Sequence, residues 1–345
     1  MEYIGIDLHK GTSQVCIVNE HGEVTERRIR TERDRFSELL TGCAPARVLL
    51  EASTESEWVA QHLETMGLEV VVADPNYAPM YGTLGRRVKT DRRDAAALCE
   101  AARTGVYRAA HRTGQEHRKL RASLNVRETM VGTRTKYINV VRALLRQQGV
   151  PVRACASSAL VRRVRELTLE PALGAQVEPL LQLLEATQAQ IAAADRELEV
   201  LAERNYTVRR LSTVPGVGPV TAATFVAVVD RAERFGRATQ LRAYLGLVPS
   251  EYSSGENRHR GRITKAGNRR LRSLLVEAAW CMLRHARPES ESLRAWAQGI
   301  AVRRGKRIAA VALARKLAGI LYAMWRDGTS FGQERIPVAR KGLAA

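Results

Sequence analysis

Four acidic side chains near the N-terminus are spaced so that a fold could bring them together. Asp7 and Glu51 each end a short apolar segment that predicts a buried strand. In a sheet where these strands are neighbours, both carboxylates emerge at one edge. Asp91 and Asp94 are three residues apart in a predicted helix, so they share a helix face. Carboxylates gathered in this way repel one another strongly unless cations neutralise them.

The chemistry that such a cluster predicts is phosphoryl transfer. Oxygen-only ligation favours Mg²⁺ or Mn²⁺ over zinc, and two such ions would activate an attacking oxygen and stabilise a leaving one. Taken singly, each residue also has an ordinary structural role, as a turn residue at a strand end or as a helix-start acid that suits the macrodipole. As an ordered set, the four resemble the carboxylates of RNase H-like nucleases. Nearby cations would meet DNA phosphates: Lys89, Arg92 and Arg93.

A second candidate site lies in residues 253–267, which we predict to be a glycine- and arginine-rich loop. Ser254 immediately precedes a glycine, and its alcohol could attack a DNA phosphorus if a metal or a base stood beside it. Ser253 is the rival nucleophile. Nothing close in sequence activates either serine, so simple phosphate binding is the alternative. The cations that would stabilise transition-state charge or bind phosphates are Arg258, Arg260, Arg262 and Lys265.

A third motif is the glycine turn Val214–Pro219, which resembles the turn of a helix-hairpin-helix. Gly216 and Gly218 permit tight backbone geometry, and amides at the start of the following helix would hold a phosphate without identifying the base. A purely structural turn is the alternative.

The elements that position these residues follow from hydrophobic periodicity. The N-terminal pattern predicts a mixed sheet with helices packed on it, an α/β fold. We predict strands at 3–7, 14–18, 24–29, 48–51 and 68–73. We predict one helix that Thr31 caps, a second helix at 55–66 and a third at 91–102. Strand signals then nearly vanish. Two long helices, over 120–148 and through 180–201, predict a helical hairpin or coiled-coil arm that serves as a spacer or for dimerisation.

The predicted organisation therefore has four parts. An RNase H-like (RuvC-like) α/β domain covers 1–110, a helical arm covers 111–209, a mostly α domain bearing the serine covers 210–330 with helices to about Trp325, and a polar tail covers 331–345.

Composition narrows the partners. The chain has 345 residues, 45% of them hydrophobic, and 55 basic against 36 acidic side chains give a net charge of +19. Such a field favours polyanions, of which nucleic acid is the commonest. No apolar stretch approaches the roughly 20 residues that span a bilayer, and we predict no secretory signal and no membrane. Five scattered cysteines predict reduced thiols in a cytoplasmic, nucleoid-associated protein.

Together, these segments resemble the DEDD-type insertion-sequence transposases, a family of bridge-RNA-guided serine recombinases. The resemblance covers nearly the whole chain. It rests on Gly5-Ile6-Asp7, Leu50-Glu51-Ala52, Val88-Lys89-Thr90-Asp91 with Asp94, Pro215-Gly216-Val217-Gly218, and Ser254-Gly255 leading to Thr264-Lys265-Ala266-Gly267.

The resemblance implies a metal-binding RuvC-like domain formed by Asp7, Glu51, Asp91 and Asp94, with Ser254 as the catalytic serine. It further implies a covalent phosphoserine intermediate, a guide RNA that pairs with donor and target DNA, and a homo-oligomer between dimer and tetramer. In the tetramer, the RuvC-like domain of one subunit completes the serine site of another. Two alternatives remain at this point: a RuvC-like structure-specific endonuclease without serine chemistry, and a non-catalytic nucleic-acid-binding protein.

Overall fold

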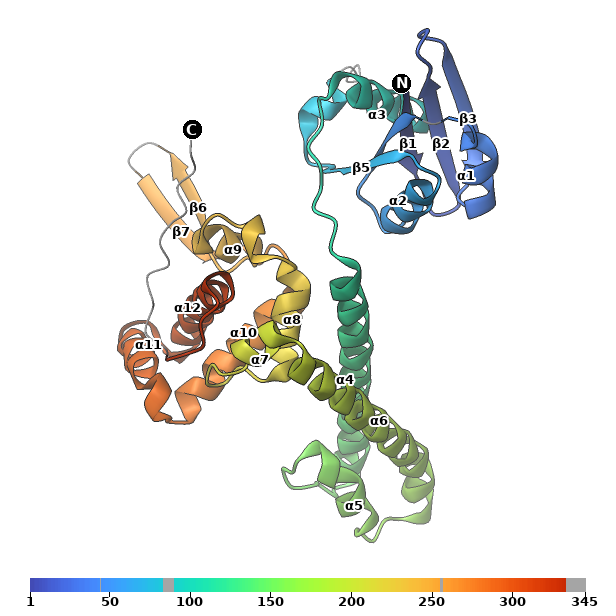
Figure 1. Ribbon diagram of the computed structural model, residues 1–345. Helices are drawn as coiled ribbons and strands as arrows, with labels where there is room; N and C mark the ends of the chain where they lie inside the picture. Colours follow the sequence, from blue (N-terminus) through green and yellow to red (C-terminus); the bar gives the residue numbers. More distant parts are fainter. Residues whose placement is uncertain (44, 83–89, 255–256, 333–345) are drawn as a thin grey trace. The chain divides into compact units, whose positions relative to one another are not determined.

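The structure is a computed structural model that describes residues 1–43, 45–82, 90–254 and 257–332, with the side chains of 252–260 outside that description. The chain divides into two units, Met1–Thr113 and Gly114–Ala345. Figure 1 shows both units and labels helices and strands in each.

The first unit is built on a mixed sheet of five strands in the order β3-β2-β1-β4-β5. β1, β2 and β3 pair antiparallel, whereas β4 runs parallel to β1 and to β5. The predicted mixed sheet is confirmed, and each predicted strand end lies within two residues of the observed one. The strands are β1 (Glu2–Leu8), β2 (Thr12–Val18), β3 (Val24–Arg30), β4 (Ala46–Glu51) and β5 (Glu69–Ala73).

Helices cover both faces of this sheet. α1 (Arg33–Leu40) and α2 (Ser56–Thr65) pack on one face, where Ile4, Ile6 and Phe36 share a buried apolar cluster. α3 (Asp91–Thr104) packs on the other face, with the short η1 (Ala78–Tyr81) beside it. Because strand side chains alternate, neighbouring residues of β1 face different helices. This alternation decides which side chains reach α3.

The prediction that Thr31 caps α1 is wrong. Glu32 occupies the N-cap position and its side chain makes no capping hydrogen bond. Thr31 instead donates its hydroxyl to the His9 carbonyl at 2.7 Å and shares a 2.8 Å hydrogen bond with the Ser13 hydroxyl. The hydroxyl therefore ties the end of β3 to the turn after β1.

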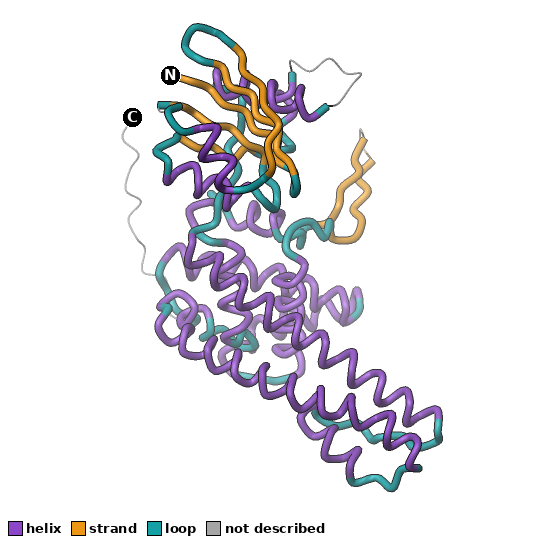
Figure 2. The backbone as a smooth tube through the Cα atoms, turned by 90° about the vertical axis from the view of Figure 1, so that its right-hand side faces the viewer, coloured by secondary structure: helices purple, strands orange, loops and turns teal. Residues whose placement is uncertain are grey.

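The second unit begins with a helical arm. α4 (Gln115–Gln147) and α6 (Pro171–Arg204) are longer than predicted and lie side by side, as Figure 2 shows. η2 (Ser157–Ala159) and α5 (Leu160–Arg165) lie between them in the chain. A separate apolar cluster holds the far end of the arm together: Val141, Leu145, Leu160, Val161, Val164, Leu173, Val177, Leu181 and Leu184.

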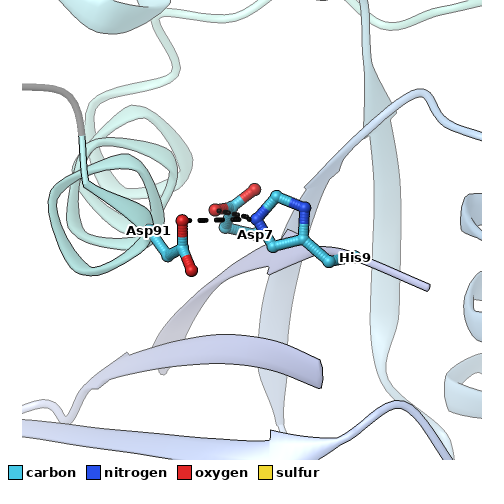
Figure 3. Close-up of side chains that lie close together, drawn as sticks. All are labelled: Asp7, His9 and Asp91. Carbon is cyan, nitrogen blue, oxygen red and sulfur yellow. Dashed lines mark ion pairs between the residues drawn. The ribbon is translucent and has the colours of Figure 1, made fainter. Parts of the chain in front are cut away.

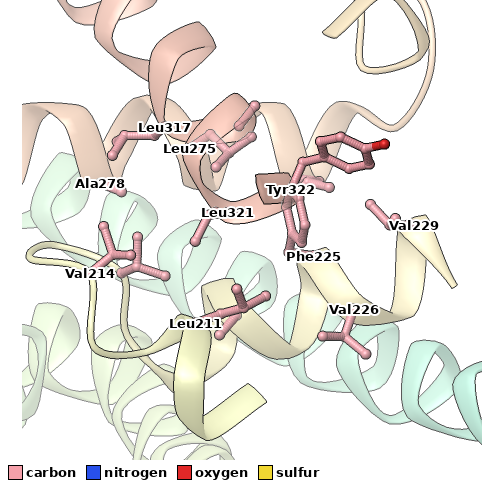
Figure 4. Packing of buried hydrophobic residues seen from close by; sticks show 14 of the residues in the cluster. Leu211, Val214, Phe225, Val226, Val229, Leu275, Ala278, Leu317, Leu321 and Tyr322 are labelled. Carbon is pink, nitrogen blue, oxygen red and sulfur yellow. The ribbon is translucent and has the colours of Figure 1, made fainter. Parts of the chain in front are cut away.

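The rest of this unit is mostly helical. Its elements are α7 (Tyr206–Leu211), α8 (Pro219–Val229), η3 (Ala232–Arg234), α9 (Ala238–Tyr244), β6 (Pro249–Ser254), β7 (Asn257–Ile263), α10 (Arg269–Arg284), η4 (Pro288–Ser290), α11 (Glu291–Arg304) and α12 (Lys306–Asp327). Figure 4 shows the buried apolar side chains that join α7, α8, α10 and α12, including Phe225, Leu275 and Leu321.

Helix α12 is long and apolar enough to cross a membrane by length and composition. In this unit, however, Leu313, Leu317 and Leu321 are fully buried against the other helices. The apolar face of α12 is therefore that of a core helix.

The prediction of a loop over 253–267 is wrong for the described residues up to Ile263. β6 and β7 form an antiparallel hairpin in which Ser254 pairs with Asn257, and the segment after Ile263 is irregular. The glycines and arginines favoured a loop, but Tyr252, His259 and Ile263 are compatible with a strand period of two.

Candidate active site

Strand alternation turns two of the predicted carboxylates toward α3. On β4, Val48 and Leu50 join the cluster beneath α1 and α2, whereas Leu49 packs with α3 residues. Glu51 therefore lies on the α3 face, and the same alternation on β1 places Asp7 there. Ile6 pairs with Leu50 in the parallel register, so Asp7 and Glu51 follow it as neighbours.

Helix α3 crosses β1 at unusually close range. A Cβ atom added at Gly5 would lie 2.1 Å from the Ala95 carbonyl oxygen and 2.2 Å from the Cys99 amide nitrogen. Only glycine allows this approach. The Thr90 side chain caps α3 by accepting from the Arg93 amide, so the helix starts at Asp91. Asp91 and Asp94 are thus brought to the strand end that carries Asp7.

A histidine joins two of the aspartates. The His9 Nε2 atom lies 3.3 Å from an Asp7 oxygen and 3.3 Å from an Asp91 oxygen, as the dashed lines in Figure 3 show. One ligand atom from each of Asp7, His9 and Asp91 lies within 4.8 Å of the other two. The side chain of Asp7 is 11% exposed, whereas those of Asp91 and His9 are about half exposed, so the cluster opens to solvent on one side.

The other two carboxylates act on the same group. Burial raises the pKa of Asp7 above its ordinary range, the electrostatic interaction with His9 opposes this shift, and the charges of Asp94, Asp91 and Glu51 reinforce it. The Tyr81 hydroxyl donates to Glu51 at 2.8 Å, and burial with that hydrogen bond raises the pKa of Tyr81. The four predicted carboxylates therefore share one electrostatic environment.

These donors fit a divalent cation. Ligands about 2.1 Å from a common ion lie at most about 4.2 Å apart, so the three donors need only a small inward movement. A cation would also relieve the repulsion that raises the pKa of Asp7. The imidazole is an addition to the oxygen-only set that the sequence predicted.

The predicted basic neighbours have different surroundings. Arg92 forms an ion pair with Glu26 of β3 and remains largely exposed, and the exposed Arg93 follows it on α3. Lys89 lies outside the described residues. The helix start therefore presents positive charge next to Asp91.

The comparisons with known proteins identify the family. A family model described as "Transposase IS116/IS110/IS902 family" matches residues 208–294, and another described as "Transposase" matches residues 4–149. The chain is 31% identical to a probable family 20 transposase of Pseudomonas aeruginosa, over 95% of the chain and 98% of the relative. It is 30% identical to the transposase for insertion sequence element IS1111A of Coxiella burnetii, over 94% and 89%. It is 29% identical to the transposase for insertion sequence element IS1328 of Yersinia enterocolitica, over 96% and 98%.

The chain belongs to the IS116/IS110/IS902 transposase family. The family predicted from the sequence is confirmed. Membership makes this an enzyme that cuts and rejoins DNA, and the α3 face of its sheet is the candidate site for that chemistry.

The second candidate site of this transposase is the β6–β7 hairpin. Ser253 and Ser254 end β6, and their side chains, with those of Arg258 and Arg260, lie outside the described residues. Arg262 and Lys265 are exposed.

The base of this hairpin is held firmly. The Thr264 amide donates to the Val248 carbonyl at 2.9 Å, and Lys265, which has a positive φ of 58°, donates to the Gly246 carbonyl at 3.1 Å. A Cβ at Gly267 would lie 1.9 Å from the Tyr244 carbonyl oxygen. The segment Thr264–Gly267 therefore has a demanding backbone that fixes the hairpin on α9.

The glycine turn before α8 is partly buried. Gly216 has a positive φ of 81°, and a Cβ there would lie 2.7 Å from the Ala278 carbonyl oxygen of α10. This close packing supplies a structural reason for Gly216. Gly218 is exposed at the N-cap of α8, where Pro219 removes one of the amides that a phosphate would use.

Sequence reasoning missed two residues of the candidate site, His9 and Tyr81. His9 follows Asp7 by two residues, and that spacing at a strand end was the available signal. Tyr81 lies 30 residues from Glu51 in a short 3-10 turn, and its part in the site follows only from the folded chain.

Proposed function

We propose that this transposase breaks and rejoins the DNA at the ends of an insertion sequence with two sites. Asp7, Glu51, Asp91 and Asp94 belong to an RNase H-like, RuvC-like domain that holds Mg²⁺ or Mn²⁺, and Ser254 is the nucleophile. The observation that carries this proposal is that Asp7 and Asp91 lie within reach of one cation on the α3 face, where the charges of Asp94 and Glu51 also act on Asp7, in a chain that belongs to a transposase family. Three antiparallel strands followed by two parallel ones support the RNase H-like assignment.

The residues of the first site would bind the divalent cations and position the groups around them. Bound divalent cations would supply positive charge for the attacking and leaving oxygens of phosphoryl transfer. Asp7 and Asp91 would provide ligand oxygens, His9 would keep the two carboxylates together, and Tyr81 would orient Glu51 through its hydrogen bond. Arg92 and Arg93 would attract the DNA backbone toward the helix start.

The serine would perform the covalent step. Its Oγ forms a bond to phosphorus while the bond from phosphorus to the departing deoxyribose oxygen breaks, the serine proton leaves, and the departing oxygen takes up a proton. The corresponding deoxyribose hydroxyl of a second strand end then attacks the phosphorus and loses its proton, while the bond from phosphorus to the serine Oγ breaks and the serine takes up a proton. Arg258, Arg260, Arg262 and Lys265 would stabilise the charge on the phosphate oxygens. Gly216 would shape the turn that allows the exposed Gly218 to contact the DNA backbone.

An assembly of subunits is part of the proposal. A serine alcohol is a weak nucleophile by itself, so it requires a metal or a base nearby. In a homo-oligomer between dimer and tetramer, the RuvC-like unit of one subunit would complete the serine site of another. A guide RNA would supply the sequence information, and the net charge of +19 suits binding of both nucleic acids.

The test is an excision assay with the flanking element DNA, its RNA and Mg²⁺ present. We expect Ser254→Ala and Asp7→Asn each to abolish excision, and Asp34→Asn, an exposed carboxylate on α1 on the opposite face, to leave it unchanged. Ser253→Ala separates the two serines. Metal-dependent nicking that survives in Ser254→Ala, without strand exchange in the wild type, would instead identify a structure-specific endonuclease.

A further inference from the structure

The junction of α11 and α12 carries a cluster of exposed cations. Arg303 and Arg304 end α11, Lys306 and Arg307 begin α12, and all four side chains are exposed. We call these four residues the basic turn. The Arg303 Nε donates to the Gly299 carbonyl at 3.3 Å, which leaves its remaining donors toward solvent.

The geometry of the basic turn depends on a single residue. Gly305 is at once the C-cap of α11 and the N-cap of α12, with φ 84° and ψ 156°. This backbone region is open essentially to glycine alone. Because α11 and α12 pack against one another through residues such as Leu293, Ala297 and Leu313, the turn is held by a buried core. The four cations are therefore presented by rigid helix ends.

Nothing nearby in the sequence balances their charge. From 292 to 326 the chain has eight lysines and arginines and no acidic residue. Among the residues that the structure describes, none of the four cations forms an ion pair. Arg162 and Arg165, exposed arginines on the arm, by contrast form ion pairs with glutamates.

Two of these cations also oppose the electrostatics of the helix that carries them. Lys306 and Arg307 occupy the first positions of α12, where the positive end of the helix dipole disfavours cations. Arg303 and Arg304 stand at the negative end of α11, where cations are favoured. Lys306 and Arg307 therefore cost stability in the free protein, and an anion bound beside them would recover it.

From this arrangement we infer that the basic turn binds the phosphate backbone of double-stranded DNA, independently of base sequence. The inference rests on the proposed function, which requires DNA, and adds a contact surface remote in sequence from both candidate sites. A duplex backbone fits because its phosphates are regularly spaced and its recognition needs only exposed cations on a rigid support.

The test compares two variants of the full chain, each with four positive charges removed. The first replaces Arg303, Arg304, Lys306 and Arg307 by Gln. The matched control replaces Arg153, Arg162, Arg196 and Arg204, which are equally exposed but lie on the arm, three of them among glutamates, by Gln. Binding to a duplex of arbitrary sequence is measured in EDTA over a salt series, so that the carboxylate site takes no part.

We expect the basic-turn variant to bind DNA at least about tenfold more weakly at moderate salt. The slope of log K against log salt should also become shallower by about 2 to 4, because each lost phosphate contact removes about 0.9 from that slope. The control should change much less. The melting temperature of the basic-turn variant should change little, because removing Lys306 and Arg307 relieves unfavourable charge at the start of α12 while removing Arg303 and Arg304 gives up favourable charge at the end of α11.

Equal losses in the two variants would overturn the inference, since general charge would then explain binding. An unchanged salt dependence of DNA binding in the basic-turn variant would also overturn it. The proposed function is tested separately, because excision activity that persists in this variant would leave it intact. If the variant lost affinity for single-stranded or duplex RNA of the same length but not for DNA, RNA would be the partner and the inference would be wrong. Asp7→Asn should bind DNA like the wild type, which separates this surface from the metal site.

Discussion

The close crossing of α3 over β1 makes Gly5→Ala a sharp test of how the fold builds the site. A Cβ at this position would lie 2.1 Å from the Ala95 carbonyl oxygen, and real Cβ contacts do not fall below 3.0 Å, so α3 must retreat by about 0.9 Å. The obstructing atoms are backbone, and a rotamer change cannot relieve them. Overpacking of this kind costs about 1 to 3 kcal/mol in the free energy of unfolding.

The retreat should reach the carboxylates directly. Asp94 adjoins Ala95, so it moves with the obstructed turn, whereas Asp7 stays with β1. A displacement near 1 Å between reacting groups can cost about a hundredfold in rate. We therefore expect Gly5→Ala to lower excision by about that factor and to weaken metal-dependent stabilisation.

Two measurements on the full chain check this expectation. Thermal unfolding with and without Mg²⁺ reports stability and metal binding, and a loss of 1 kcal/mol should lower the melting temperature of a unit of this size by about 4 to 8 °C. Excision rates report the chemistry. Gly11→Ala is the matched control, because a Cβ at Gly11 meets nothing within 4 Å. If Gly5→Ala kept wild-type stability, metal response and excision, the argument that the α3 crossing positions the site would be refuted.

Three further variants test the site, and the first has two expected outcomes. Asp7→Asn should raise the melting temperature in EDTA at neutral pH: because the folded-state pKa of Asp7 is raised, its contribution to stability is present at low pH and is lost as pH rises through that pKa. Thermal unfolding across acidic to neutral pH measures this, and a stability curve with the same slope in both proteins would contradict it. The same variant should lose most of the stabilisation by Mg²⁺, which for the wild type is about 2.7 kcal/mol at about 100 times the dissociation constant. His9→Ala should weaken Mn²⁺ binding about 10- to 100-fold, measured by calorimetry, and unaltered affinity would remove His9 from the site. Tyr81→Phe should slow excision by roughly two- to tenfold, because Glu51 loses a hydrogen bond worth about 0.5 to 1.5 kcal/mol; an unchanged single-turnover rate would show that the bond is only structural.

Much of the first unit could be predicted because its signals are local. Apolar runs bounded by turns marked all five strands, and the mixed sheet followed from three strands and then alternating helices and strands. The edge shared by Asp7 and Glu51 followed from strand ends alone. The helix face shared by Asp91 and Asp94 followed from their spacing.

The rest depended on contacts that a sequence does not display. Tyr81 reaches Glu51 across 30 residues, and His9 meets Asp91 only because α3 lies close to β1. The β6–β7 hairpin was predicted as a loop because its arginines and glycines outweighed a weak alternation. The close packing of Gly216 against Ala278 likewise gives a structural role to a glycine that a local motif assigned to phosphate binding.

The two faces of the sheet contribute differently to the stability of the unit and to the positions of its carboxylates. The face under α1 and α2 is filled by large apolar side chains such as Ile6 and Phe36, so truncations there should cost stability through cavities while leaving the carboxylates in register. Where α3 crosses β1, the contact is made by Gly5, Ala95 and Cys99, whose small size brings the helix backbone close to the strand, while larger side chains such as Leu49 and Leu98 are buried beside the crossing. The small residues at the crossing contribute little burial themselves. In the proposed function, their close approach would hold acidic groups from a strand and a helix within reach of one cation.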